Sequence, residues 1–313
     1  MVRVMPVFLA GAAAVLAATE QASKPSFVVE KHPAIWDIVP RDARIQKIAG
    51  DFRFTEGPVW NRSGYLLFSD IPANTIYKWV PSGTVTVFRS PSGNSNGLTY
   101  DKQRRLIACE HSTRRVTRTE KDGSITVLAE RYEGKRLNSP NDVVVKSDGS
   151  IYFTDPPYGI SPDQQELPFC GVYRISPKGE LTLLVSDFSR PNGLAFSPDE
   201  KRLYIADSSD RSHIRVFDVK PDGTLENGRL FAVLKTGEEG VPDGMKVDTQ
   251  GNLYFTGPAG IWIFRPDGTH LGTIRFPEVP ANCAFGGRDG RWLYVTARTS
   301  VYRIRLKIPG IRP

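Results

Sequence analysis

Six oxygen-bearing side chains recur along the sequence, each at the start of a short hydrophobic run that resembles a β-strand. They are Glu56, Asn96, Asn141, Asn192, Asp243 and Asn282. A second strand-like run follows each of them, reading YLLFSD, RLIACE, SIYFTD, RLYIAD, NLYFTG and WLYVTA in chain order. Such a repeat indicates rotational symmetry, and equivalent positions in a symmetric structure point at the same axis. We therefore expect the six side chains to converge.

A ring of this composition could hold a hard divalent cation. Calcium takes roughly six to eight oxygen ligands from carboxylates, amide carbonyls and water. Glu56 and Asp243 would supply two negative charges, and the four asparagines would supply neutral oxygens. No Cys or His occupies a ring position, which disfavours zinc and copper. The pattern fits Ca²⁺ best and leaves other divalent cations open.

These motifs allow two other interpretations. Asn before Gly is a common turn dipeptide, which would account for Asn96 and Asn192 but not for Glu56. The segment Gly93–Gly97 matches the G-x-S-x-G pattern of serine hydrolases, with Ser95 as nucleophile. That pattern requires a helix after the serine, whereas a strand-like run follows here. We therefore do not expect Ser95 to be a nucleophile.

The elements that would position the ring are short strands. Apolar runs rich in Val, Ile, Tyr, Phe and Leu end at Asp-Gly, Ser-Gly or Pro-Asp turns, and helical periodicity is almost absent. Successive ring residues are separated by 40, 45, 51, 51 and 39 positions, the period of four-stranded blades. The sequence predicts an all-β fold, a six-bladed β-propeller, in preference to a β-sandwich. The sixth repeat lacks a fourth strand, which residues 43–52 near the N-terminus could supply to close the ring.

Composition excludes several classes of partner. The chain of 313 residues has a formal net charge of +7, and part of the excess is local, from arginines between residues 104 and 131 in two neighbouring repeats. Aromatic residues are not interleaved with these arginines, so we expect a solvated face and no nucleic-acid binding. Attraction of an anionic substrate stays open. The three cysteines, Cys109, Cys170 and Cys283, form no C-x-x-C pair, which argues against disulfides or a zinc site and favours core positions.

The N-terminus predicts export. Residues 1–18 read as a signal peptide, with Arg3 followed by an apolar run of 12 residues from Val7 to Ala18. Residues 19–42 would form an N-terminal extension and residues 43–313 the propeller hydrolase domain. The protein would then be secreted or periplasmic, with no membrane association after cleavage. An uncleaved anchor is the alternative, as is a mis-assigned start codon, which would leave the protein in the cytoplasm. The oligomeric state stays open.

Five stretches together resemble a known family. FTEGPVW, NSPNDVVV, YFTDPPYG, RPNGLAFSPD and VPDGMKVD look like motifs of the gluconolactonase, regucalcin (senescence marker protein) and luciferin-regenerating-enzyme family of six-bladed propellers. The resemblance covers roughly Ala43 to Lys307. SGNSNGL, ACEHSTRRVTR and RLNSPNDVVVKSDG resemble the bacterial gluconolactonase branch most.

The resemblance implies a calcium ion at one end of the central channel. Its ligands would be Glu56, Asn141, Asn192 and Asp243, with Asn96 and Asn282 beside them. Asp243 would be the catalytic base, and the substrate-binding residues would be Asn141, Asn96, Glu110, His111 and Tyr158. Glu110, His111, and Asp155 with Tyr158 are rival sources of the base. Ser139 stands where the regucalcin branch has an arginine that helps bind the sugar, which leaves the sugar contacts of that branch open.

The implied reaction is hydrolysis of a small-molecule sugar lactone such as gluconolactone. The cation would polarise the lactone carbonyl while water attacks its carbon atom. Two alternatives stay open. The same site could act on other esters or on organophosphates, and the propeller could bind calcium without catalysis.

Overall fold

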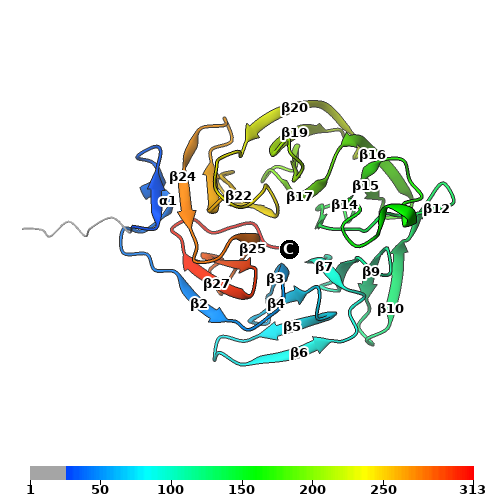
Figure 1. The fold of residues 1–313 in the computed structure, drawn as a ribbon, viewed down its shortest axis with the longest axis horizontal. Helices are drawn as coiled ribbons and strands as arrows, with labels where there is room; N and C mark the ends of the chain where they lie inside the picture. Colours follow the sequence, from blue (N-terminus) through cyan, green and yellow to red (C-terminus); the bar gives the residue numbers. More distant parts are fainter. Residues whose placement is uncertain (1–25) are drawn as a thin grey trace, which may run out of the picture.

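The structure is a computed structural model that describes residues 26–313, and it shows six antiparallel sheets around a central axis (Figure 1). The predicted six-bladed propeller is confirmed, with four consecutive strands in each of blades one to five. The predicted signal peptide, residues 1–18, lies outside the described residues.

The strands of each blade follow one another outward from the axis. Blade one contains β3 (Thr55–Asn61), β4 (Tyr65–Asp70), β5 (Thr75–Trp79) and β6 (Val85–Arg89). Blade two contains β7 (Ser95–Tyr100), β8 (Leu106–Glu110), β9 (Arg115–Thr119) and β10 (Ile125–Ala129). Blade three contains β13 (Val143–Val145), β14 (Ile151–Asp155), β15 (Cys170–Ile175) and β16 (Leu181–Phe188). Blade four contains β17 (Pro191–Phe196), β18 (Arg202–Asp207), β19 (His213–Val219) and β20 (Leu225–Val233).

The last two blades both receive a strand from the N-terminal region. Blade five contains β21 (Met245–Val247), β22 (Leu253–Gly257), β23 (Gly260–Phe264) and β24 (His270–Arg275), and β1 (Val28–Glu30) pairs with β24. Blade six contains β25 (Pro280–Gly286), β26 (Trp292–Ala297) and β27 (Ser300–Arg305). Its fourth strand is β2 (Gln46–Ala49), antiparallel to β27, so the predicted ring closure is confirmed.

The remaining elements lie outside the blades. A short helix, α1 (Ile35–Ile38), follows β1, and its buried side chains pack with residues of blades five and six. A two-stranded hairpin, β11 (Arg131–Tyr132) and β12 (Lys135–Arg136), leads into blade three. A 3₁₀ turn, η1 (Pro162–Gln164), lies in the loop before β15. Within residues 26–313, no helix has both the length and the apolar character to cross a membrane.

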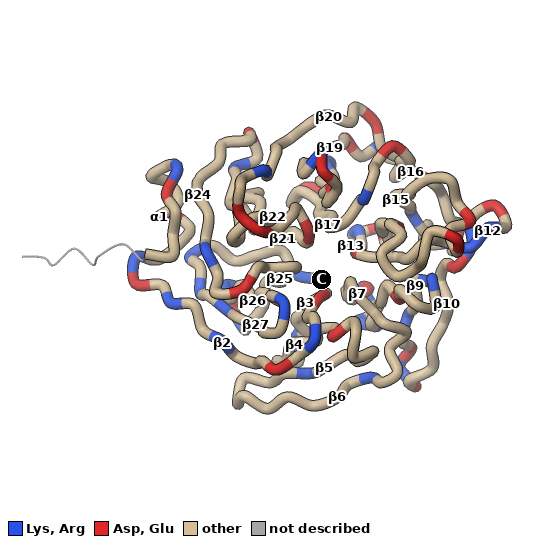
Figure 2. Tube along the Cα trace, in the orientation of Figure 1, with Lys and Arg blue, Asp and Glu red and all other residues tan. Residues whose placement is uncertain are grey.

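Apolar packing between neighbouring blades forms the core. One buried cluster joins Ile107 and Val116 of blade two to Val143 and Phe153 of blade three, and similar clusters lie at other blade interfaces. Because a blade is covered on both faces, its middle strands are apolar along their whole length rather than alternating. Cys109, Cys170 and Cys283 are all buried and unpaired. Lys and Arg are spread around the ring of blades rather than gathered in one patch (Figure 2).

Candidate metal centre and active site

The six ring residues lie where the innermost strands begin. Glu56, Asn96, Asn192 and Asn282 belong to β3, β7, β17 and β25, while Asn141 and Asp243 lie two positions before the first residues of the short strands β13 and β21. Five of the six side chains are nearly inaccessible to solvent, with Glu56 2% and Asn141 1% exposed. Asp243 is partly exposed. The ring therefore faces inward and opens to solvent at Asp243.

Hydrogen bonds connect the ring side chains directly. Asn96 Nδ2 donates to Asn141 Oδ1 at 2.7 Å, and Asn141 Nδ2 donates to Asn192 Oδ1 at 2.5 Å. On the other side, Asn282 Nδ2 donates to Glu56 Oε2 at 3.0 Å. Asp243 joins both groups, because Asn192 hydrogen-bonds its carboxyl group and the charge of Glu56 acts on it. The structure brings all six predicted residues to one place.

Glycines after the ring residues explain how the strands come so close. Gly57 has φ +51°, and a Cβ atom there would lie 1.9 Å from the carbonyl oxygen of Asn96. Gly97 lies within β7, and its N–H donates to the Asn141 carbonyl at 2.8 Å. The Asn96-Gly97 pair is therefore part of an inner strand. The glycine serves close strand packing here, and the turn interpretation does not apply.

The carboxyl groups of the ring are held under electrostatic strain. Burial raises the pKa of Glu56 to about 7, and the negative charge of Asp142 adds to the effect. Burial also raises the pKa of Asp243 well above its ordinary value, followed by the charges of Glu56 and Asp142. Glu56 and Asp142 are buried and Asp243 is partly exposed, and three carboxylates near one another disfavour their own ionisation. A bound cation would relieve this repulsion.

One buried amide oxygen of the ring has no partner among the described residues. Asn96 Oδ1 is buried and accepts no hydrogen bond within residues 26–313. Glu56 Oε2 accepts from Gly57 N at 2.5 Å and from Asn282, which leaves Oε1 for another partner. No three His, Cys, Asp or Glu side chains in the described part of the chain cluster closely enough to hold a metal by themselves. The donor set therefore mixes carboxylate and amide oxygens, which suits a hard cation and not a soft one.

The amide oxygens of Asn141 and Asn192 are engaged within the ring. Asn141 Oδ1 accepts from Asn96 and lies 3.1 Å from His111 Nε2, and Asn192 Oδ1 accepts from Asn141. To present these oxygens to a cation, the amides must exchange partners. Glu56 and Asp243 need no such exchange, so they are the primary candidates for holding the ion.

His111 follows the last residue of β8 and contacts the ring. Its Nε2 lies 3.1 Å from Asn141 Oδ1 and 3.4 Å from Asn96 Nδ2, and the side chain is buried. Burial lowers the pKa of His111 to about 4, so the imidazole is neutral near pH 7. A neutral ring with its proton on Nε2 donates to Asn141. This makes His111 an orienting group for the amide chain rather than a charged one.

Tyr158 lies at the entrance to the ring. The residue is 39% exposed, and the Arg190 guanidinium carbon is 5.9 Å from the centre of its ring. Burial around the hydroxyl raises the pKa of Tyr158 to about 12, and the hydroxyl interacts with Ser208 and Asn192. The phenol thus reaches from solvent to the ring. The contact of Tyr158 with substrate stays a prediction.

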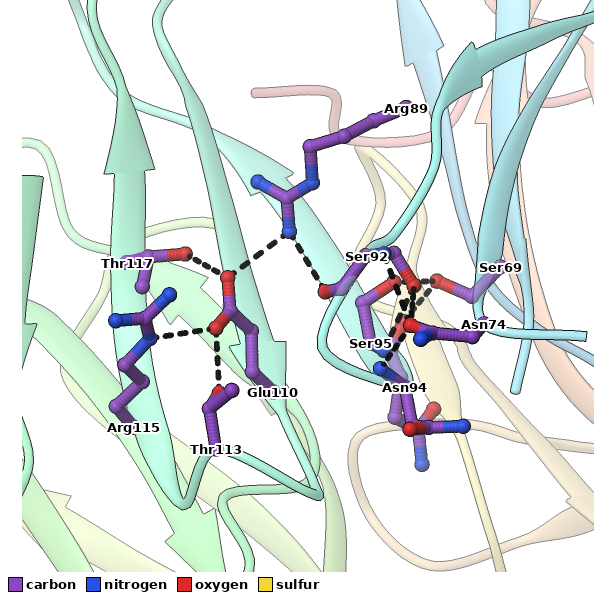
Figure 3. Close-up of polar contacts among 11 residues, drawn as sticks. Ser69, Asn74, Arg89, Ser92, Asn94, Ser95, Glu110, Thr113, Arg115 and Thr117 are labelled. Atoms are coloured by element: carbon purple, nitrogen blue, oxygen red, sulfur yellow. Dashed lines mark hydrogen bonds and ion pairs between the residues drawn. The ribbon is translucent and has the colours of Figure 1, made fainter. Parts of the chain in front are cut away.

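Glu110 lies in a different environment from the ring, shown in Figure 3. Its Oε1 accepts from Arg89 at 3.0 Å and Thr117 at 2.8 Å. Its Oε2 accepts from Thr113 at 2.5 Å and Arg115 at 2.6 Å. Four donors, two of them cationic, engage both oxygens of a side chain that is 2% exposed. This network stabilises blade two and leaves Glu110 no free oxygen for substrate or for a proton.

Asp155 and Ser95, two other side chains that the sequence suggested for catalysis, also have structural roles. Asp155 is fully buried and accepts the backbone N–H groups of Asn138 and Ser139, each at 2.8 Å. Ser95 has no exposed surface, and its hydroxyl lies 3.0 Å from that of Ser69 (Figure 3). Neither side chain can reach a substrate, which agrees with rejecting Ser95 as a nucleophile.

Sequence reasoning missed several residues near the ring. Asp142 follows Asn141 and is a buried carboxylate, 3% exposed, that acts on both Glu56 and Asp243. Ser208 accepts from Asn192 Nδ2 at 2.8 Å and donates to the Pro242 carbonyl. The signal for Asp142 was the unusual P-N-D triplet, since the other ring asparagines are not followed by an acid. No pattern in the sequence pointed to Ser208.

Comparisons with known proteins identify the family of this chain. Residues 54–299 match the family model described as the SMP-30/Gluconolactonase/LRE-like region. The chain is 36% identical to a gluconolactonase of Zymomonas mobilis, over 98% of this chain and 95% of that protein. It is 30% identical to human regucalcin, over 78% of this chain and 83% of that protein. A solved gluconolactonase from Xanthomonas campestris is 37% identical, with a TM-score of 0.82 over 89% of this chain and 94% of that one. The chain belongs to the SMP-30/gluconolactonase/LRE-like family.

Proposed function

We propose that this protein is a calcium-dependent hydrolase of sugar lactones. The observation that carries the proposal is the convergence of Glu56 and Asp243 with four amides on one axis, where Asn96 Oδ1 has no partner. The named activity of the Zymomonas and Xanthomonas relatives supports the lactone as substrate class. Glu56, Asn141, Asn192 and Asp243 would hold the ion, and Asn96 Oδ1 offers a further oxygen.

A bound calcium ion supplies a Lewis acid that stabilises the negative charge developing on a lactone carbonyl oxygen. The chain supplies the other requirements. The closely packed inner strands fix the ring oxygens, because glycines such as Gly57 and Gly244 allow contacts that a side chain would block. A rigid arrangement of this kind costs no reorganisation during the reaction.

Asp243 is the best-placed base for the attacking water. It is the partly exposed carboxylate of the ring, and burial and its acidic neighbours raise its pKa well above the ordinary value. The exposure of Asp243 favours it as the base, because water can reach it; the raised pKa belongs to the ring without an ion, and a bound cation would lower it. The rivals fit less well, since the pKa of His111 is lowered to about 4 and Glu110 and Asp155 are engaged by donors.

Substrate contacts would come from the entrance. The Tyr158 hydroxyl and the Arg190 guanidinium lie on one side, and His111 and Asn96 lie deeper. These groups are neutral or cationic donors, which suit the hydroxyl groups of a sugar ring. Because Ser139 Oγ accepts the Gly159 N–H at 2.9 Å, that serine holds the loop carrying Tyr158.

Turnover of a lactone with and without a chelator tests the proposal. Gluconolactone hydrolysis should be lost after EGTA treatment and return with CaCl₂, and Glu56→Gln should behave like the chelated enzyme. Hydrolysis that survives both changes contradicts the metal-dependent mechanism. Calcium binding without turnover of any lactone would favour a binding protein, and turnover of aryl esters or organophosphates alone would favour the other hydrolase class.

The location outside the cytoplasm remains a separate prediction, resting on residues 1–18. N-terminal sequencing of the protein from its native host should find a chain that begins after this segment. An intact Met1 on soluble protein would contradict export.

A further inference from the structure

The central channel has a second end, opposite the ring. A cavity of about 380 Å³ lies there, and the innermost strand of every blade contributes to its wall. The apolar part of the wall includes one residue from each blade: Val59, Leu98, Val143, Ala195, Val247 and Ala284. The wall continues into the turns after these strands, where Arg62, Lys102 and Ser147 lie. The cavity therefore lies on the propeller axis, at the end of the inner strands that is far from the ring.

The last residues of the chain cover one side of this cavity. The C-terminus lies at the centre of the ring of blades (Figure 1). The Ile311 N–H donates to the Val247 carbonyl of blade five at 3.0 Å, and Arg312 Nη1 donates to the Gly287 carbonyl beside blade six at 2.8 Å. Both Ile311 and Arg312 line the cavity. Because these contacts tie the segment to two blades, it forms a fixed part of the wall.

The charged side chains of the cavity are mostly cationic. The basic ones are Arg62, Lys102, Lys146, Lys246 and Arg312, and the acidic ones are Asp101 and Glu200. Both acids already have basic partners. Asp101 Oδ2 accepts from Arg105 Nε at 2.7 Å, and Glu200 Oε2 lies 3.4 Å from Lys146 Nζ. These carboxylates therefore leave most of the positive charge of the cavity uncompensated.

Three of the basic side chains, Lys102, Lys246 and Arg312, form no ion pair with another residue of the range 26–313. Lys246 Nζ donates to the Met245 carbonyl at 2.8 Å, and Arg312 also donates to a carbonyl. A neutral carbonyl accepts a hydrogen bond without cancelling the positive charge of the donor. Lys102 and Lys246 come from blades two and five, which face each other across the axis of a six-bladed ring. Positive charge on opposite sides of one cavity attracts an anion.

We propose that this cavity binds a small organic carboxylate with an apolar body. Its volume falls in the range of ligand pockets, roughly 300–1,000 Å³, and apolar walls with a few charged groups are typical of such pockets. The apolar body would contact the inner-strand side chains, and the carboxylate would face Lys102, Lys246 and Arg312. A free sugar acid fits less well, because its hydroxyl groups would lie against apolar walls without partners. The site is separate from the ring, so the inference rests neither on calcium nor on lactone hydrolysis.

Isothermal titration of the protein with naphthoate in EGTA tests this inference. Naphthoate should bind with a stoichiometry of one. The neutral analogue naphthalenemethanol has the same aromatic body and should bind at least about tenfold more weakly, because it lacks the charge that the basic groups attract. Acetate carries the charge without the apolar body and should show no measurable binding. Calcium should leave the affinity for naphthoate within about twofold, since the ion would bind at the other end of the channel.

Lysine variants locate the binding site. Lys102→Met and Lys246→Met each remove a charge while keeping most of the side-chain volume, and each should weaken naphthoate binding at least about threefold. The double variant should weaken it at least about tenfold. Lys121, an exposed lysine in the turn between β9 and β10, does not line the cavity, so Lys121→Met is the matched control and should stay within about twofold of wild type. Melting temperatures confirm that each variant is folded.

Absence of naphthoate binding, or equal affinity for the neutral analogue, overturns the inference. Wild-type affinity in the folded double variant overturns it as well, because the anion would then bind elsewhere. Competition between calcium and naphthoate would place the anion at the ring and would also contradict the inference. Failure of lactone turnover would reject the proposed function alone, since none of these titrations depends on hydrolysis.

Discussion

Acidic side chains occupy two kinds of position in these repeats, and the two behave differently. One kind lies where an innermost strand begins, as Glu56 and Asp243 do. The other lies where the second strand ends, as Asp70, Asp155 and Asp207 do. Both kinds are buried or partly buried, and both belong to the repeat. The difference between them is the supply of hydrogen-bond donors.

The strand-end acids are surrounded by backbone N–H groups. Asp70 accepts from Arg53 and Phe54, Asp155 from Asn138 and Ser139, and Asp207 from Ser189, Arg190 and Ser209. Apart from Ser209, these donors belong to the segment that enters the innermost strand of the same blade, which the acid therefore holds in place. Burial raises the pKa of Asp207, but these hydrogen bonds outweigh it, so the pKa falls below its ordinary value.

The ring acids have few donors and acidic neighbours. Glu56 receives one backbone N–H and one amide, and Asp243 receives an amide from Asn192. The same residue type therefore serves structure where the backbone supplies donors and offers its charge to a ligand where it does not.

The largest expected effect comes from neutralising a ring acid. Asp243→Asn should reduce lactone turnover by at least about 10³-fold, because it removes both the base and a ligand. Without calcium, its free energy of unfolding should equal or exceed that of wild type, since one of three repelling carboxylates is gone. Steady-state kinetics and urea unfolding measure the two quantities. Turnover within tenfold of wild type would remove Asp243 from the mechanism.

Removing a strand-end acid should have the opposite effects: it should lower the stability of the protein and leave calcium binding nearly unchanged. Asp155→Ala leaves two buried N–H groups without an acceptor, so the free energy of unfolding should fall by about 2–4 kcal/mol. Calcium affinity of the folded variant should stay within a few-fold of wild type. Asp155→Asn is the matched control and should lose less stability, because its carbonyl oxygen still accepts. An undiminished stability of the alanine variant would contradict the structural assignment.

The pH dependence of stability separates the two kinds of acid further. The folded pKa of Glu56, about 7, lies above its ordinary value of 4.5, so the folded protein binds the extra proton. Stability without calcium should therefore fall as pH rises from about 5 to 7, on the order of 1–3 kcal/mol. Burial also raises the pKa of Asp155 to about 7, so Asp155 contributes to the same loss of stability. Only the ring acids would bind calcium, so the part of the loss that added calcium removes is the part due to the ring.

Melting temperatures across this range, with EGTA or with CaCl₂, measure the effect, and Glu56→Gln should flatten the EGTA profile. If calcium leaves the pH dependence of the melting temperature unchanged, the ring acids do not bind the ion.

The smallest expected effect is at Ser95. Ser95→Ala removes a buried hydroxyl contact with Ser69 and should cost about 1 kcal/mol of stability. Lactone turnover should stay within about twofold of wild type, because the hydroxyl cannot reach substrate. Loss of turnover in a folded Ser95→Ala protein would reopen a serine mechanism.

The repeat alone was sufficient to predict the blades, the closure by β2 and the convergence of the ring. The regular spacing of the strand-like runs predicts the blades, and the single oxygen-bearing residue at the same position of each repeat predicts the ring. The pairing of β1 with β24 could not be predicted, because three residues near the N-terminus give no pattern that selects a strand some 240 positions away.

The roles of single acids were harder to predict than their positions. Glu110 ends the second strand of its blade like Asp70, yet it binds Arg89 and Arg115 while Asn74 accepts the backbone N–H groups of Ser92 and Asn94. Which donors surround a strand end depends on loop conformation, which spacing does not encode. The same limit applies to Asn282, whose amide nitrogen and not its oxygen faces the acids.

A crystal structure of the protein with calcium, using the anomalous signal of the ion, tests the central claim most directly. We expect one calcium ion on the propeller axis, within about 2.3–2.6 Å of Glu56 and Asp243 oxygens, with amide oxygens of the ring completing its coordination. An ion bound elsewhere, or an axis without anomalous density at saturating calcium, would contradict it.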